Sequence, residues 1–285
     1  MAFYDELQTL LDEVADRVDR WTSTASWTFE PGSPTEAEVA NGERCRDGSP
    51  WGERPVLSVY QLAQMATKYT IEMARCIALL VGASRPAPGI EVLTRSSLEA
   101  ASVVWWLLEE ELSARQRVCR MQLLRRNSAR ELSKSIAEVG ADPAMAGGES
   151  VANVEAYGHR LGLAPFGSKG EEMEGERRPG YTARVKSFTD EMGYQGSYSI
   201  YSGTAHAELA GLWRLFPTLA SGSSPIYSPG PDPKATYAAA HGALKSMMGC
   251  MERIALLFGW PAPGRGEEVG QTIDLINAEM DRLRP

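Results

Sequence analysis

The segment that decides the fold runs from Glu91 to Leu112 and reads EVLTRSSLEAASVVWWLLEEEL. Between Glu99 and Glu109 it carries no charge, and at about 100° per residue its Val, Trp and Leu side chains point in every direction. A helix that is apolar on all sides is buried on all sides. We therefore expect a buried central helix over residues 91–112, with the rest of the chain packed around it.

One face of this central helix carries polar groups toward the core. Helical spacing places four side chains within an arc of about 60°, and these are Arg95, Glu99, Ser102 and Trp106. An arginine and a glutamate four residues apart stabilise a helix by only about 0.2–0.5 kcal/mol, whereas removing their charges from water costs several kcal/mol per ion. Two interpretations remain open: a structural pair within the helix, or a functional pair beside a cavity.

Apolar periodicity predicts further helices on both sides of the central one. Ser113 and Gln116 form a capping-box pattern at the start of one of them, and Asp232 followed by Pro233 marks the start of another. No strand pattern and no internal repeat stands out. We expect an all-α, bundle-like fold in a single domain, with seven or eight helices around the central one; these flanking helices cover about 3–21, 58–81, 113–139, 150–161, 181–192, 198–216, 232–259 and 267–283.

Three long segments rich in Gly, Pro and Ser separate these helices, at residues 22–55, 164–180 and 217–233. The first is long enough to be a lid or to contain short elements, and Trp27, Phe29 and Trp51 would attach it to the body. The second is charged and Gly-rich, which is typical of a disordered loop.

The composition is that of an ordinary globular protein, with 43% hydrophobic and 23% charged residues among 285. No apolar run is long enough to cross a membrane, and the start, MAFYDEL, is acidic where a signal peptide would be basic, so we expect a cytoplasmic protein. The four cysteines form no Cys-x-x-Cys pair, which argues against disulfides and zinc. A net charge of -8 argues against nucleic acid as a partner.

The absent motifs exclude several chemistries. The sequence contains no phosphate-binding loop, no Gly-x-Gly-x-x-Gly, no Gly-x-Ser-x-Gly and no His-Glu-x-x-His. None of His159, His206 and His241 has a glutamate three residues before it, as a di-iron helical bundle requires. We therefore expect neither a metal nor a cofactor.

Polar residues on other predicted helices could join the central pair. They are Arg125 on the apolar arc of helix 113–139, Tyr198, Ser202 and His206 on one later helix, and Tyr237 and His241 on another. A buried arginine needs a carboxylate, and Glu99 is a candidate partner for Arg125. The other arginines of helix 113–139 lie mostly opposite its apolar arc, where they would face solvent, an acidic partner or the acidic first helix.

The leading hypothesis is a small-molecule enzyme of specialised biosynthesis, with a pocket beside residues 95–106. Arg95 and Arg125 would hold an anionic group of the substrate, Glu99 or His206 would be the base, and the remaining residues would orient the substrate. Such a set suits elimination, cyclisation or hydrolysis without a cofactor. The structural alternative is that the tyrosines and histidines are satisfied core residues.

Two other functions remain open. The chain could be a non-catalytic helical subunit that binds a copy of itself or another protein, or an effector-binding protein that uses the same pocket without turnover. Homo- or hetero-oligomers are compatible with each of the three hypotheses.

Two short runs, RSSLEA at 95–100 and YSGTAH at 201–206, resemble signatures of uncharacterised all-helical proteins of high-GC bacteria, written Arg-Ser-x-x-Glu and Tyr-Ser-x-x-x-His. They cover about a tenth of the chain. A helical nuclease-toxin pattern, Arg-x(4 to 6)-His, is excluded because no arginine occurs at 152–154, 199–201 or 234–236.

Overall fold

The computed structural model describes residues 2–23, 28–40, 42–84, 87–140, 149–194, 198–206, 232–260 and 265–284. Within this part of the chain the predicted all-α class is confirmed, with ten helices and one two-stranded sheet. The helices outnumber the expected seven or eight, in part because a short one, α2 (Pro34–Val39), lies in a segment predicted as loop. No described helix is long and apolar enough to cross a membrane.

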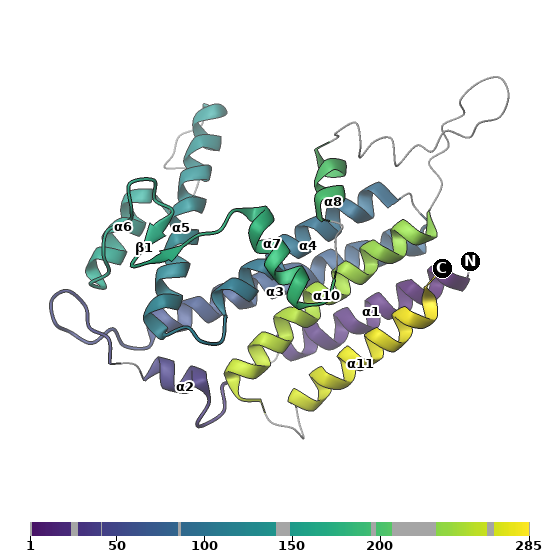
Figure 1. Ribbon diagram of the computed structural model, residues 1–285, viewed down its shortest axis with the longest axis horizontal. Helices are drawn as coiled ribbons and strands as arrows, with labels where there is room; N and C mark the ends of the chain where they lie inside the picture. Colours follow the sequence, from purple (N-terminus) through teal and green to yellow (C-terminus); the bar gives the residue numbers. More distant parts are fainter. Residues whose placement is uncertain are drawn as a thin grey trace.

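Long helices form the main body (Figure 1). They are α1 (Ala2–Ser23), α3 (Arg54–Gly82), α4 (Ala87–Leu107), α10 (Pro233–Phe258) and α11 (Arg265–Leu283). Helix α4 packs against α3 and α10, and two shorter helices, α7 (Tyr181–Glu191) and α8 (Tyr198–Ala205), also pack on it. The two chain ends lie side by side, where α1 runs along α11 (Figure 1).

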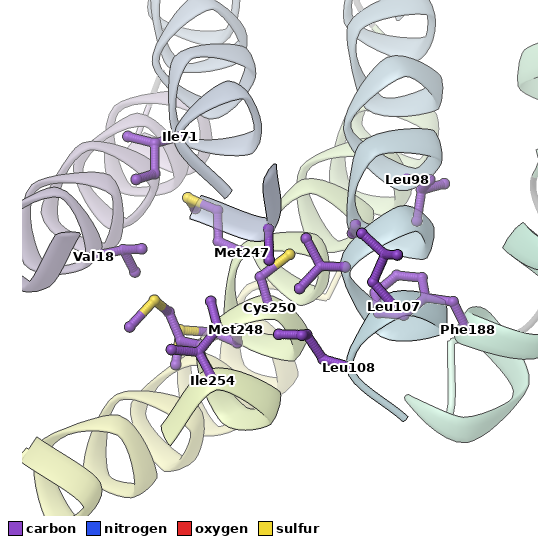
Figure 2. Packing of buried hydrophobic residues seen from close by; sticks show 14 of the residues in the cluster. Val18, Ile71, Leu98, Leu107, Leu108, Phe188, Met247, Met248, Cys250 and Ile254 are labelled. Carbon is purple, nitrogen blue, oxygen red and sulfur yellow. The ribbon is translucent and has the colours of Figure 1, made fainter. Parts of the chain in front are cut away.

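Helix α4 is shorter and less evenly buried than residues 91–112 were predicted to be. It ends at Leu107, and Trp105 and Trp106 are only half-buried. The buried apolar side chains at its end face a long neighbour: Figure 2 shows Leu107 and Leu108 gathered with Met247, Met248 and Cys250 of α10. The opposite side of α4 has only short helices to cover it, so its apolar surface is not closed all round.

Two glycines on α10 allow its neighbours to approach closely. A Cβ atom at Gly242 would lie 2.9 Å from Cγ2 of Thr94 on α4, and one at Gly249 would lie 2.7 Å from Cε2 of Phe188 on α7. Phe188 is fully buried and has little room to move. The absence of side chains at these positions therefore sets the distance of α4 and α7 from α10.

A matched pair of substitutions tests this packing. In Gly249→Ala the gain in helix propensity, about 1 kcal/mol, is outweighed by overpacking, which costs about 1–3 kcal/mol. Gly270→Ala on α11 adds a methyl group with no atom within 4 Å, so the same propensity gain should raise stability by about 0.5–1 kcal/mol. Urea unfolding of both variants measures the difference. Equal stabilisation by the two substitutions would contradict the close approach of α7 to Gly249.

Arginines of α5 (Ala114–Glu138) bind the C-terminal end of α4. The predicted capping box at Ser113 and Gln116 is present and starts α5 in a new direction. Arg117, which has no exposed surface, donates from Nη1 to the Leu107 carbonyl at 2.9 Å, and Arg120 donates from Nη1 to the Trp106 carbonyl at 2.6 Å. The last carbonyls of a helix lack partners within it and carry partial negative charge, so cations are stabilising there.

In the described part of the chain the basic residues of α5 form no ion pair with the acidic first helix, which was one of the expectations, and Lys134 is the most exposed of them. Most of the α5 arginines pair with glutamates in or next to α2, the sheet segment and α6 (Val151–Arg160); the partners are Glu38, Glu43, Glu149, Glu155, Glu174 and Glu176. Figure 1 shows α5, α6 and the sheet grouped away from the main body. Ionic contacts therefore hold this group together.

The segment 164–180, predicted to be disordered, contains an antiparallel hairpin of β1 (Glu172–Met173) and β2 (Glu176–Arg177). Its two turn residues have positive φ angles, 52° at Glu174 and 84° at Gly175, as two-residue hairpin turns favour. A steric penalty disfavours glutamate in that conformation. Arg115 offsets the penalty, because it donates to both carboxylate oxygens of Glu174 at 2.6 and 2.7 Å.

The other predicted loops contain short structure or fall outside the described residues. Trp51 anchors segment 22–55 by donating to the Leu161 carbonyl at 2.8 Å, and Phe29 packs edge-on against Phe258. Trp27 and most of the segment 217–233 lie outside the described residues. The predicted cap at Asp232 is present and accepts from the Lys234 amide at 2.9 Å.

Candidate functional site

Three of the predicted residues meet between α4 and α8. Nε of Arg95 and the hydroxyl of Tyr198 both donate to Oε1 of Glu99, at 2.9 and 2.8 Å. The Arg95 guanidinium carbon lies 5.9 Å from the centre of the Tyr198 ring. The Glu99 side chain is 27% exposed, so a solute can reach it. The pair is therefore more than a contact along one helix, because a residue from α8 joins it.

The protonation states of this cluster follow from its contacts. Burial raises the pKa of Tyr198 above its usual 10, and the hydrogen bond to Glu99 raises it further. The phenol is therefore a hydrogen-bond donor at neutral pH. Among the described residues, Oε2 of Glu99 accepts no hydrogen bond, which leaves one carboxylate oxygen available to a ligand.

Ser102 links the cluster to α7. Its side chain is fully buried, and Oγ donates to the Glu99 carbonyl at 2.7 Å while it accepts from Nε of Arg184 at 3.0 Å. Trp106, one turn further along α4, lies under the Arg120 guanidinium, 5.1 Å from ring centre to Cζ. Ser102 and Trp106 thus hold neighbouring elements in place.

Unlike Tyr198, the other predicted residues on the later helices have no hydrogen bond to Glu99 in the described structure. Ser202 is half-buried, and its carbonyl accepts from the amide of His206, whose side chain is exposed just after the end of α8. Tyr237 donates its hydroxyl to the Met280 carbonyl of α11 at 2.8 Å. Tyr237 therefore has the structural role of joining α10 to α11.

The predicted pairing of Arg125 with Glu99 is wrong. Nε and Nη2 of Arg125 donate to the two carboxylate oxygens of Glu149, at 2.9 and 2.5 Å. Its guanidinium also stacks on Tyr157, 5.0 Å from the ring centre. The cause is that α5 leaves the main body beyond the end of α4, which carries Arg125 toward α6.

His241 lies half-buried on α10, against the rings of Tyr194 and Tyr237. Burial lowers its pKa from 6.5 to about 4, and the positive charges of Lys245 and Arg284 add to this. The imidazole is therefore neutral at physiological pH and cannot attract an anion by charge.

This shift predicts a pH dependence. Because the unfolded chain binds a proton at His241 more readily than the folded one, the contribution of His241 to stability is complete above pH 6.5 and is lost as the pH falls from 6.5 to about 4. The full loss is about 3 kcal/mol. NMR titration should give the low pKa, and His241→Gln should flatten the pH dependence of stability in that range. A titration midpoint near 6.5 would contradict this.

A cavity of about 570 Å3 opens between α5 and α7, with Leu62 of α3 and Val103 of α4 at its base. We call it the arginine cavity. Three arginines line it together with apolar and polar side chains; the lining residues are Leu62, Val103, Leu124, Arg125, Asn127, Ser128, Glu131, Leu132, Ser135, Arg178, Tyr181 and Arg184. The volume is in the range of small-molecule sites, which are mostly apolar with a few polar groups.

Arg184 is the most unusual of the lining residues. It is only 4% exposed, and its Nε donates to Ser102, while no carboxylate of the described residues lies within ion-pair distance. Burial lowers the pKa of its guanidinium, and the nearby charge of Arg178 lowers it further. The negative charge of Glu99 acts in the opposite direction and raises the pKa of Arg184. A buried arginine normally has an anion beside it.

Arg178, just before α7, is also incompletely satisfied. Its side chain is 10% exposed, and its Nε is buried without a hydrogen-bond partner among the described residues. The nearest carboxylate oxygen, of Glu171, lies 3.9 Å from Nη2, which is too long for a hydrogen bond. Arg178 and Arg184 therefore both line the cavity without a hydrogen bond to a carboxylate among the described residues.

The one carboxylate in the lining, Glu131, does not neutralise them. It accepts from Lys134 at 3.1 Å and from Arg130 at 3.2 Å, and these hydrogen bonds lower its pKa. The cavity is thus positively charged although the whole chain carries -8.

Sequence reasoning identified Arg125 as a cavity residue but missed Arg178, Tyr181 and Arg184. Arg184 precedes Phe188 by four residues on α7, so it lies on the apolar stripe of that helix. This is the same signal that singled out Arg125 on α5. Arg178 had no such signal, because it belongs to the segment predicted as a disordered loop.

Comparison with known proteins adds no further assignment. The chain matches no known family model, no curated protein and no solved structure. The resemblance of the runs at 95–100 and 201–206 to helical proteins of high-GC bacteria stays a prediction. The function has to be inferred from the chemistry of the cavity and of the Glu99 cluster.

Proposed function

We propose that the protein binds a small molecule with an anionic group, and that the arginine cavity holds this group. The observation that carries the proposal is the pair of buried guanidinium groups, Arg178 and Arg184, which lack carboxylate partners at hydrogen-bonding distance in the described structure. A planar guanidinium group binds carboxylate or phosphate through two parallel hydrogen bonds. An anion between them would satisfy donors that are otherwise costly to bury.

The rest of the lining favours a ligand with an apolar part. Leu62, Val103, Leu124 and Leu132 form the apolar surface of the cavity, and Tyr181 lies at its wall. The Arg184 guanidinium carbon is 5.4 Å from the centre of the Tyr181 ring, so the ring and Ser102 hold the arginine in one orientation. A site with fixed donors loses less entropy on binding.

Removal of one guanidinium tests the proposal. Phenyl phosphate and octanoate each combine one anionic group with an apolar body, and we expect both to bind the wild-type protein at low ionic strength. Arg184→Gln should weaken binding by a factor of ten or more, because a charge-assisted hydrogen bond contributes about 1.5–3 kcal/mol. Isothermal titration calorimetry measures the affinities.

Arg75→Gln is the matched control, since it removes the same charge from an arginine that pairs with Asp16 and Asp19 at the α1–α3 surface. It should leave both affinities unchanged. An equal loss in Arg75→Gln and Arg184→Gln would mean that only net charge matters and would reject the cavity as the binding site.

A second candidate function is acid-base catalysis on the bound molecule. The geometry of Glu99 favours this candidate. Arg95 and Tyr198 hold one of its carboxylate oxygens, and the other oxygen is available. The carboxylate also interacts electrostatically with Arg184 of the arginine cavity. A carboxylate held in this way can accept a proton from a substrate, and the Tyr198 hydroxyl can donate one. The elimination, cyclisation or hydrolysis expected from the sequence would use these two groups.

Replacement of the base tests the catalytic candidate. The protein is incubated with a small-molecule extract rich in carboxylates and phosphates, and mass spectrometry records which compounds disappear. Glu99→Gln should slow any conversion by about 100-fold or more, the usual contribution of a general base, with an unchanged circular dichroism spectrum. Arg184→Gln should lower conversion through weaker binding. Conversion at the wild-type rate by Glu99→Gln would exclude Glu99 as the base and leave the binding proposal intact.

A further inference from the structure

A second cavity lies next to the arginine cavity. It has a volume of about 460 Å3 and lies between α3, α5 and α6; its lining residues are Arg54, Ser58, Gln61, Leu62, Met65, Met121, Arg125, Tyr157 and Arg160. We call it the outer cavity. Leu62 and Arg125 line both cavities, so the two are adjacent and share a wall.

The outer cavity also carries cations without carboxylate partners. Arg54 and Arg160 are exposed, and within the described part of the chain neither lies within ion-pair distance of a carboxylate. The guanidinium carbons of Arg160 and Arg125 each lie 5.0 Å from the centre of the Tyr157 ring, which holds both against one aromatic surface. Among the described residues, no carboxylate belongs to the lining of this cavity.

The two cavities follow one another along α5. The outer cavity contacts Met121 and Arg125, and the arginine cavity contacts α5 from Leu124 to Ser135. The two cavities share Leu62 and Arg125, whereas Arg178 and Arg184 line only the arginine cavity and Arg54 and Arg160 line only the outer cavity. Apolar side chains near the shared wall come from both cavities, with Leu62, Met65 and Met121 in the outer one and Leu62, Val103 and Leu124 in the arginine cavity.

We infer that the ligand is an elongated small molecule with an anionic group at each end and an apolar middle. This inference rests on the proposed function. One anionic group would bind Arg178 and Arg184, the middle would lie over Leu62 and its apolar neighbours, and the second group would bind Arg54 and Arg160. Both volumes are those of small-molecule sites, which favours such a ligand over a peptide.

Arg125 separates the two anion sites and does not belong to either. Two nitrogens of its guanidinium group already donate to Glu149, so its charge is compensated without a ligand. This explains how a third arginine can lie between two anion sites without attracting the ligand's apolar part.

The test compares unbranched dicarboxylates of 4 to 12 carbons with monocarboxylates of equal length. Binding to the full chain is measured by calorimetry at low ionic strength for the wild type, Arg160→Gln and Arg184→Gln. Two linked groups bind most strongly when the linker matches the distance between their sites. We expect a maximum at one chain length, where the dicarboxylate binds at least ten times more tightly than its monocarboxylate.

The variants separate the inference from the proposal on which it rests. Arg160→Gln should reduce the best dicarboxylate to the affinity of its monocarboxylate without changing the latter, and Arg184→Gln should weaken both. If dicarboxylates show no advantage while Arg184→Gln still weakens monocarboxylates, the second anion site is rejected and the proposed function stands. If no carboxylate or phosphate binds, both fail. If a hexaglutamate peptide binds more tightly than every dicarboxylate, with the same dependence on Arg160, the small-molecule class is overturned.

Discussion

The arrangement of this protein depends on a buried arginine at the point where α4 ends. Arg117 binds the Leu107 carbonyl with one nitrogen and the carboxylate of Glu38 with another, at 2.9 Å in each case. It thereby joins the end of α4 to α5 and α2, and its positive charge meets the negative end of the α4 dipole. Loss of Glu38 would leave the charge of Arg117 uncompensated in the interior. The direction in which α5 leaves the body follows from this contact, and the arginine cavity exists because α5 leaves in that direction.

Much of the fold could be predicted from the sequence because its signals are local. The capping box at Ser113 and the cap at Asp232 each depend on residues within one turn, and both are present in the structure. The hairpin at 172–177 could not be predicted in this way. Its glutamates have little local preference for a strand, and they are ordered by Arg115 and Arg120 on a distant helix.

The candidate site shows the same division. The Arg95–Glu99 pair was predicted because both residues lie on one helical face. Tyr198 was predicted as a site residue, but the sequence did not indicate that its hydroxyl would bind Glu99. The partner of Arg125 was wrongly predicted, since the choice between Glu99 and Glu149 depends on the crossing of α4 and α5. Arg184 carried a readable signal, an arginine on an apolar stripe. Whether Arg184 would bind a carboxylate of the chain or a ligand depended on which carboxylates the fold brings near it. A local sequence pattern does not predict these tertiary contacts.

The hairpin has a consequence for how the molecule responds to its solvent. The main body is held by apolar packing, which salt does not weaken, whereas the hairpin is attached to α5 chiefly through charged groups, which salt screens. Arg178 follows directly after this hairpin and lines the arginine cavity. Dissolved ions therefore act on the anion site twice: they compete with the ligand for the guanidinium groups, and they loosen the element that holds one of those groups in position.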